Sequence, residues 1–205
     1  MWYPIKTYSI VRWLFSKYTW LGPKKKEPTI YLTFDDGPKP KITNWVLEQL
    51  ANYDAKATFF CVGANVEKYP DIYQQVLAQG HKVGNHTFNH MNGWKHSNTK
   101  YIDNVEQCAE FVDSKLFRPP YGKIRKKQAK VLLEEGYDII MWDIIAGDFD
   151  PSISGEKCLQ NILKHCQDSS IIVLHDSTKA WPRLEYVLPR FLDYCVEQGY
   201  SFSTL

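Results

Sequence analysis

Short apolar runs alternate with amphipathic stretches along most of the chain. Seven of these runs are predicted strands, at 29–34, 57–62, 81–84, 116–117, 137–142, 171–174 and, more weakly, 200–205. The runs at 137–142 and 171–174 are apolar on consecutive residues, which is typical of strands covered on both faces. The pattern therefore favours a parallel sheet.

The stretches between the predicted strands have helical periodicity. Apolar residues recur every three or four positions, for example at Ile42, Val46 and Leu50, so they lie on one face of a helix. Parallel strands need helical crossovers of this kind. The sequence therefore predicts an α/β fold in one domain, either an open doubly wound sheet or a barrel. An eight-unit barrel takes about 250 residues, so a barrel of this 205-residue chain would be a reduced one.

The first 28 residues do not follow this alternation of apolar runs and amphipathic stretches. Their apolar runs are short and broken by Lys6, Arg12 and Lys17, and linker-like residues follow at 22–28. We expect residues 1–28 to form a helical and linker extension packed on a domain of residues 29–205. The extension lacks the continuous apolar stretch of a membrane span and the small-residue cleavage site of a signal peptide, so a cytoplasmic location is the default expectation. Its aromatic and cationic residues also suit a helix that lies on a membrane surface.

Composition and charge limit the kinds of protein and of binding partner that the sequence can represent. A hydrophobic content of 44% with 23% charged residues is ordinary for a globular protein and excludes a disordered or fibrous chain. The net charge of +2 is too small to predict nucleic acid as a partner, and Lys and Arg gather only at 24–26 and 123–130. The five cysteines are odd in number and lie in apolar or helical patterns, which indicates core residues rather than disulfides or a zinc knuckle. The oligomeric state stays open.

Chemically reactive side chains follow the C-terminal ends of five predicted strands. In chain order they are Asp35 and Asp36, His86 and His90, Arg118, Asp143 and Asp148, and His175 and Asp176. Active sites of parallel α/β proteins are built at this edge of the sheet. We therefore expect these residues to converge on one face of the fold.

The first predicted strand ends in two adjacent carboxylates, Asp35 and Asp36. Successive side chains of an extended segment point in opposite directions, so the pair should have different tasks. If one carboxylate binds a cation, the other can stay ionised beside it and act as a base. The alternative is a turn in which Asp caps the backbone before Gly-Pro, although such a turn needs only one Asp.

Two histidines, His86 and His90, lie four residues apart and can direct both imidazoles at one ion from a helix or a loop. Two histidines and a carboxylate suit zinc or another borderline divalent cation and leave coordination positions open, as in catalytic sites. The remaining histidines, His81, His96 and His165, have no such partners in the sequence, and we assign them to packing or to the surface.

Five motifs in order resemble those of the polysaccharide deacetylases with the NodB homology domain, carbohydrate esterase family four. They are TFDDGP at 33–38, HTFNH at 86–90, RPPYG at 118–122, WDIIAGDFD at 142–150 and LHD at 174–176. The resemblance extends over about residues 29–205 and implies a distorted, shortened (β/α) barrel of about seven parallel strands.

The resemblance also implies roles by position in the motifs. Asp35 is expected to be the catalytic base, oriented by Arg118. Asp36, His86 and His90 are expected to hold one divalent metal ion, with zinc favoured over cobalt or nickel.

Further residues complete the implied site. The backbone N–H of Tyr121 resembles the donor of the oxyanion hole, and His175 resembles the general acid that protonates the departing amine. The candidates for the pocket around the substrate are Leu174, Trp142, Asp148 and Pro120. Trp142 also fits a core, since it ends a buried strand. Trp94 and Trp181, in polar surroundings, are candidates for stacking on a sugar ring.

The fourth motif departs from the Asp-x-x-Asp-Trp pattern of the family. With Asp148 aligned, Ile145 and Phe149 stand where the first Asp and the Trp are expected. Either Asp143 or Asp148 then supports His175 through a rearranged loop, or His175 works with another support and a shifted pKa.

The activity that the resemblance implies is metal-dependent hydrolysis of the N-acetyl group of a glycan containing GlcNAc, of the chitooligosaccharide or peptidoglycan type. An O-acetyl ester of the acetylxylan type, or a formyl group on a sugar, is an alternative substrate. A non-catalytic sugar-binding relative is the rival outside the enzymes, and it would be expected to have lost a metal ligand or the acid.

Overall fold

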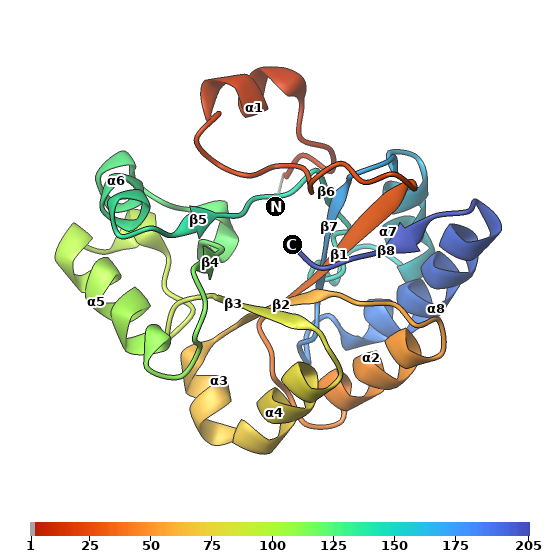
Figure 1. The fold of residues 1–205 in the computed structure, drawn as a ribbon, viewed down its shortest axis with the longest axis horizontal. Coiled ribbons are helices and arrows are strands. Elements are labelled where there is room, and N and C mark those ends of the chain that lie inside the picture. Colours follow the sequence, from red (N-terminus) through yellow and green to blue (C-terminus); the bar gives the residue numbers. More distant parts are fainter. Residues whose placement is uncertain (1–2) are drawn as a thin grey trace.

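The structure, a computed structural model, describes residues 3–205. In this part of the chain, eight strands form one curled sheet in the order β5-β4-β3-β2-β1-β7-β6, with β8 beside β1, and every strand pair is parallel. The strands are β1 (Thr29–Asp35), β2 (Thr58–Cys61), β3 (Lys82–Asn85), β4 (Leu116–Phe117), β5 (Asp138–Ile139), β6 (Ile144–Ile145), β7 (Ile171–His175) and β8 (Ser201–Phe202). The predicted α/β fold with a barrel-like parallel sheet is confirmed (Figure 1).

Helices surround the sheet, as the ring of coiled ribbons in Figure 1 shows. The α-helices are α1 (Ser9–Leu14), α2 (Ile42–Ala51), α3 (Gly63–Lys68), α4 (Pro70–Ala78), α5 (Asn98–Ala109), α6 (Lys126–Glu134), α7 (Gly155–Leu163) and α8 (Trp181–Glu197). Two short 3-10 helices are η1 (Gly93–Lys95) and η2 (Pro120–Gly122). As the apolar spacing predicts, α2 buries Val46, Leu47 and Leu50 on one face.

The central strand β1 is covered on both faces. All seven of its residues are buried, and Phe34 stacks on Phe59 of β2 with 5.1 Å between the ring centroids. Because β1 lies between β2 and β7, its last residue, Asp35, reaches the middle of the C-terminal edge of the sheet.

The strand predicted at 137–142 is present but shorter, as β5 at Asp138–Ile139. β5 ends at Ile139, the chain leaves the sheet, and β6 begins at Ile144 on the opposite edge, where it pairs with β7. The connecting residues Ile140 and Met141 are also buried. Burial on both sides of the crossing makes the apolar run continuous, so hydrophobicity alone does not reveal the break.

Residues 5–21 lie in the gap between β5 and β6. The Thr19 N–H donates to the Ile139 carbonyl at 2.9 Å. On the other side of the gap, the Ile145 N–H donates to the Ile5 carbonyl at 3.0 Å. The predicted N-terminal extension therefore supplies part of the barrel wall in addition to packing on it.

Asp143 anchors this N-terminal segment from inside the barrel. Its carboxylate is fully buried and accepts hydrogen bonds from Lys6 Nζ at 2.6 Å and from Ser170 Oγ at 2.7 Å. The Arg12 guanidinium lies 3.7 Å from the same carboxylate. Two cations of residues 5–21 thus share one buried counter-charge.

Replacing Asp143 with asparagine is expected to lower the free energy of unfolding by about 3 kcal/mol, because the largely buried Lys6 ammonium loses its counter-charge. Urea unfolding followed by circular dichroism measures the change. Asp103→Asn, at an exposed carboxylate of α5, is the matched control and should leave the stability unchanged. Equal unfolding midpoints for the two variants would contradict the anchoring role of Asp143.

All five cysteines are free thiols, and four of them are buried. Cys166 is partly exposed and packs against the main hydrophobic core. The prediction of core cysteines without disulfides is confirmed. Within residues 3–205, no helix combines the length and the apolar composition that crossing a membrane requires.

Candidate active site

The ends of four strands bring the reactive side chains together. Asp35 ends β1 and is the register partner of His175, the last residue of β7. His86 directly follows β3, and Arg118 directly follows β4. Because these strands are parallel, their C-terminal ends meet at one edge of the sheet, as the sequence predicts.

A cluster of possible metal ligands lies at this edge. Asp36, His86 and His90 each place one donor atom within 4.8 Å of the others. Asp36 Oδ1 is 3.2 Å from His90 Nε2 and 3.9 Å from His86 Nε2. This oxygen is buried and accepts no well-oriented hydrogen bond from the described residues. A buried carboxylate oxygen that lacks a donor and faces two imidazoles fits a divalent cation.

The protonation states of His86 and Asp36 also suit a cation. His86 Nδ1 is 2.7 Å from the Arg118 carbonyl, so Nδ1 carries the proton and Nε2 turns its lone pair to the cluster. Burial lowers the pKa of His86 to about 4, which keeps the imidazole neutral near pH 7. Burial opposes ionisation of Asp36, but the nearby His90 and the charge of His175 hold the Asp36 pKa well below its usual range. Neutral imidazoles and ionised carboxylates are the forms that bind metal ions.

Left-handed backbone angles at three residues orient the side chains of the ligand cluster. Asp36, Thr87 and His90 have φ angles of 81°, 60° and 52°. Such angles cost a non-glycine residue roughly 1–3 kcal/mol and concentrate at functional sites. Asn65 Nδ2 donates to the Asp36 carbonyl at 2.7 Å, and the Met91 N–H donates to Thr87 Oγ1 at 2.8 Å. Hydrogen bonds from α3 and from within the histidine loop therefore fix the backbone at Asp36 and Thr87.

The expectation that Asp35 and Asp36 point in opposite directions is wrong. Asp35 Oδ2 lies 4.0 Å and Asp36 Oδ1 lies 3.9 Å from the same atom, His86 Nε2. Strand geometry ends at Asp35, and the positive φ of Asp36 turns its side chain toward the same imidazole. The two carboxylates differ in their other partners, since Asp35 pairs with Arg118 and Asp36 lies against His90.

Arg118 is fully buried and holds Asp35 in position. Its Nη1 donates to Asp35 Oδ1 at 2.7 Å and to Thr33 Oγ1 at 2.6 Å. The other nitrogens, Nε and Nη2, donate to the carbonyls of Ile140 and Met141. A guanidinium fixed on all sides thus orients one carboxylate beside the ligand cluster.

Asp148 lies against His175 and accepts two hydrogen bonds from this residue. His175 Nδ1 is 2.8 Å from Asp148 Oδ1, and the His175 backbone N–H donates to Asp148 Oδ2 at 2.7 Å. Asp143, the other candidate support, instead binds Lys6 and Ser170. Burial disfavours the charged imidazole, but the negative charge of Asp148 and its hydrogen bond raise the pKa of His175 to about 10. His175 is therefore protonated near neutral pH.

The expected pocket residues are mostly buried. Asp148 is fully buried, and its two oxygens accept hydrogen bonds from His175, so its place beside a substrate stays a prediction. Leu174 is fully buried in the main core, and Pro120 is buried as well. Trp142 is partly buried and packs against two core clusters. A place for Leu174, Pro120 or Trp142 beside a substrate stays a prediction.

An exposed aromatic residue borders the ligand cluster. Tyr121 is 60% exposed, and its ring centroid is 4.6 Å from that of His90. Its φ of 61° is a left-handed backbone angle, and the role of its backbone N–H as an oxyanion donor stays a prediction. Trp94 is also exposed, with Lys123 Nζ 4.0 Å above its ring. Trp181 instead packs edge-on against another tryptophan at 5.0 Å.

Sequence reasoning assigns no role to Asp176, yet this residue supports the ligand loop. Its carboxyl group is fully buried and accepts hydrogen bonds from the Gly37 N–H at 3.0 Å and from Thr43 Oγ1 at 2.5 Å. Burial raises the pKa of Asp176 to about 8. The signal in the sequence is an acidic residue directly after a fully apolar strand, next to His175.

Comparison with known proteins finds similarity over most of the chain. A family model described as polysaccharide deacetylase matches residues 22–140. A peptidoglycan-N-acetylglucosamine deacetylase of Bacillus cereus is 34% identical over 193 residues, which cover 91% of this chain and 90% of that protein. A chitooligosaccharide deacetylase of Azorhizobium caulinodans is 34% identical over 160 residues, which cover 74% of this chain and 75% of that protein.

The fold is also similar to that of a solved structure. The Bc1960 peptidoglycan N-acetylglucosamine deacetylase, in complex with 4-naphthalen-1-yl-N-oxidanyl-benzamide, aligns with a TM-score of 0.86 at 29% sequence identity. The alignment covers 100% of this chain and 95% of that one. The N-terminal residues that close the barrel are therefore within the shared architecture.

Proposed function

Since the chain belongs to the polysaccharide deacetylase family, we propose that it removes the N-acetyl group of a GlcNAc-containing glycan by metal-dependent hydrolysis. Relatives named for peptidoglycan and for chitooligosaccharides support a substrate of either type. The observation that carries the proposal is the cluster of Asp36, His86 and His90, with Asp35 Oδ2 4.0 Å from His86 Nε2. A cation site with a second carboxylate beside it is what metal-assisted hydrolysis of an amide requires.

Asp36, His86 and His90 would hold one divalent cation. Two imidazoles and a carboxylate favour zinc, with cobalt and nickel as alternatives, and leave positions open for water and substrate. When bound, the cation supplies a Lewis acid that polarises the acetyl carbonyl and lowers the pKa of a water.

The protein's own groups carry the proton transfers. Asp35, held by Arg118, takes the proton of the attacking water. The Tyr121 N–H donates to the carbonyl oxygen as it becomes negative, and losing such a donor typically costs about 10²–10³ in rate. His175, kept protonated by Asp148, gives its proton to the departing amine as the carbon–nitrogen bond breaks and acetate leaves.

Acetate release from a panel of substrates tests the proposal. The panel holds N-acetylated chitooligosaccharides, peptidoglycan fragments and acetylated xylan, with formate release from an N-formylated sugar measured in parallel. We expect release from the N-acetylated glycans that is lost when metal is stripped and restored by zinc. Release from xylan alone would make an O-acetyl ester the substrate. No release from any metallated sample would favour the non-catalytic sugar-binding alternative.

His86→Ala is expected to reduce bound zinc from about one ion per chain to nearly none, because a zinc site of this kind needs all three protein ligands. Mass spectrometry of the metal content after dialysis measures the occupancy. His96→Ala, at a partly exposed imidazole outside the cluster, is the control and should keep its metal. Full occupancy in His86→Ala would contradict the ligand assignment.

Asp148→Asn is expected to move the alkaline limb of the pH profile of kcat to lower pH. The folded-state pKa of His175 is about 10, so the acid form that protonates the amine persists well above pH 7. Without the charge of Asp148, burial lowers that pKa, and the acid form is lost at a lower pH. Steady-state rates across a pH series measure the limb. An unchanged limb with intact metal content would show that Asp148 does not set the protonation of His175.

The location of the enzyme in the cell stays a prediction. The sequence leads us to expect the cytoplasm, and separating cells into soluble, membrane and secreted fractions tests that expectation. Deacetylase activity or an antibody against the protein serves as the marker.

A further inference from the structure

The helix α1 and its flanks expose apolar side chains to solvent. Five of them are between 41% and 70% exposed, namely Tyr8, Ile10, Trp13, Leu14 and Phe15, and we call this set the α1 ridge. The helix itself buries none of its residues. Monomeric proteins seldom expose a contiguous apolar patch of this kind without a partner for it.

Hydrogen bonds before and after α1 fix the helix so that the α1 ridge faces solvent. The Thr7 N–H donates to the Asp143 carbonyl at 2.8 Å, and the Trp20 indole donates to the Phe15 carbonyl at 3.0 Å. Trp20 is buried, and the Arg12 guanidinium faces the buried Asp143 at 3.7 Å. Val11 and Arg12 therefore face the barrel, and the side chains of the α1 ridge face solvent.

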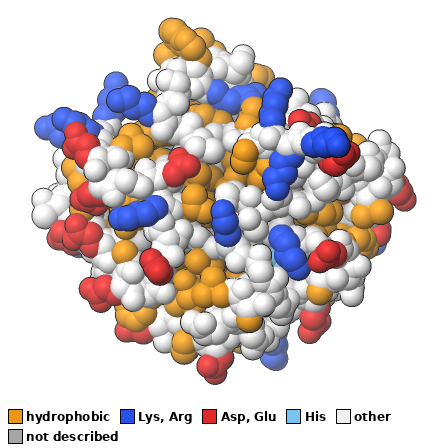
Figure 2. Space-filling view, in the orientation of Figure 1, with side chains coloured by type: hydrophobic (Ala, Val, Ile, Leu, Met, Phe, Trp, Pro, Cys, Tyr) orange, Lys and Arg blue, Asp and Glu red, His pale blue; other side chains and the backbone are white. Residues whose placement is uncertain are grey.

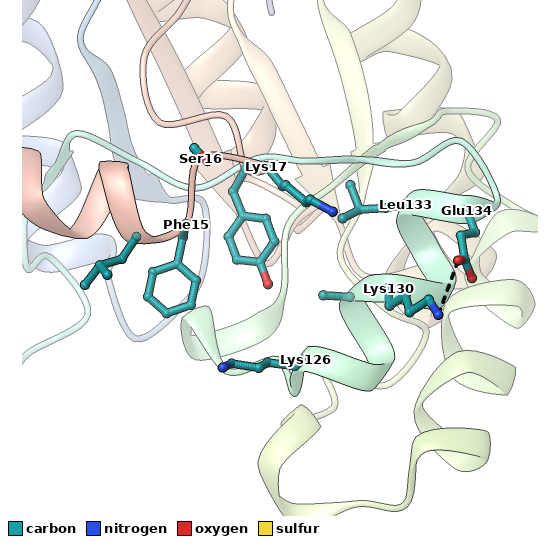
Figure 3. A pocket seen from close by; sticks show the side chains of 10 residues that line it. Phe15, Ser16, Lys17, Lys126, Lys130, Leu133 and Glu134 are labelled. Carbon is teal, nitrogen blue, oxygen red and sulfur yellow. Dashed lines mark ion pairs between the residues drawn. The ribbon is translucent and has the colours of Figure 1, made fainter.

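Lysines lie beside the α1 ridge. A groove of about 670 Å³ separates Leu14 and Phe15 from the helix α6. Figure 3 shows Phe15 and Lys17 on one side of the groove, with Lys126 and Lys130 of α6 on the other. Glu134, the acidic residue that lines it, pairs with Lys130 at 3.7 Å. The groove therefore carries a net positive charge.

The wider surface has the same character. Figure 2 shows hydrophobic side chains at the top of the molecule, where Figure 1 places α1, with Lys and Arg side chains on both sides below them. The ridge combines tryptophan, tyrosine and phenylalanine with aliphatic residues. Aromatic residues of this kind prefer the interface between lipid headgroups and acyl chains, and neighbouring lysines are attracted to anionic headgroups.

We propose that the α1 ridge inserts into the surface of a lipid bilayer that contains anionic phospholipid, with Lys17, Lys126 and Lys130 against the headgroups. Apolar insertion combined with charge attraction is the general mode of a helix that lies in a membrane interface. A second copy of the chain fits the ridge less well, because contact between two ridges would bring the lysines of both copies together. The proposal does not depend on the deacetylase reaction.

Co-sedimentation of the full chain with vesicles tests the proposal. We expect binding to vesicles of phosphatidylcholine mixed with phosphatidylglycerol, weaker binding to phosphatidylcholine alone, and weakening by added salt. The double variant Trp13→Ser, Leu14→Ser should lose at least about tenfold in partitioning, since both side chains are exposed and apolar. Lys126→Gln with Lys130→Gln should lose roughly 25-fold on the anionic vesicles, at about fivefold for each lysine.

Val196→Ser on α8 is the matched control, since Val196 is 57% exposed and lies outside the ridge. It should bind vesicles like the wild type. Urea unfolding of each variant checks that the fold is kept, and deacetylation of a soluble oligosaccharide should be equal in all of them. Binding that the ridge variant does not weaken, or no binding by the wild type, would overturn the proposal. A dimer in sedimentation velocity that the ridge variant converts to a monomer would assign the ridge to a second copy instead.

Discussion

Asp35→Asn is expected to lower kcat for an N-acetylated oligosaccharide by about 10³-fold, within the usual range of about 10²–10⁴ for a general base. Asparagine has the shape of aspartate, so it can stay beside Arg118, but it cannot accept the proton of the attacking water. Because the water attacks every substrate, we expect the loss to be similar for the glycan and for an activated ester such as 4-nitrophenyl acetate. Initial rates with the two substrates measure the effect.

Measuring the metal content distinguishes a loss of kcat caused by the missing base from one caused by a missing metal ion. Asp35→Asn should retain zinc, since Asp36, His86 and His90 are unchanged. Asp54→Asn, at an exposed carboxylate distant in the sequence from every motif, is the control and should keep full activity. Turnover of a zinc-loaded Asp35→Asn enzyme at the normal rate would refute the role of Asp35 as the base.

His175→Ala is expected to slow hydrolysis of the glycan much more than hydrolysis of the activated ester. The amine of a deacetylated sugar is a poor leaving group unless it receives a proton, so kcat for the glycan should fall by about 10²–10⁴-fold. The nitrophenolate of the activated ester leaves without a proton, so its hydrolysis should fall by less than about tenfold. The ratio of the two rates is therefore a direct measure of leaving-group protonation.

His165→Ala provides the comparison for His175→Ala, because His165 is a partly exposed histidine outside the ligand cluster. It should leave both rates near those of the wild type. If His175→Ala reduces the two substrates equally, then His175 acts on a step that they share, and the assignment as leaving-group acid is wrong.

The sequence predicts the sheet and the meeting of its strand ends because these follow from local patterns. The apolar run at 171–174 fixes β7, and His175 directly after it reaches the site simply by ending a parallel strand. Features set by strand order and alternation are thus accessible to sequence reasoning.

Other features depend on long-range packing and on single backbone angles. The direction of Asp36 follows from a φ of 81°, which no hydrophobic pattern encodes. The choice of Asp148 over Asp143 as the partner of His175 depends on Lys6, 137 residues away from Asp143 in the chain, which takes the other carboxylate. The direction of Asp36 and the partner of His175 therefore could not be predicted from the sequence.

Closure of the barrel by residues 5–21 also bears on how the protein is made. Their partners at Asp138 and Asp143 are synthesised 119 and 137 residues after Thr19 and Lys6, respectively. The N-terminal segment must therefore wait, with its aromatic side chains uncovered, until most of the polypeptide has emerged. Such distant contacts slow folding. The nascent chain therefore depends on protection from aggregation until residues 5–21 pair with β5 and β6 and close the barrel.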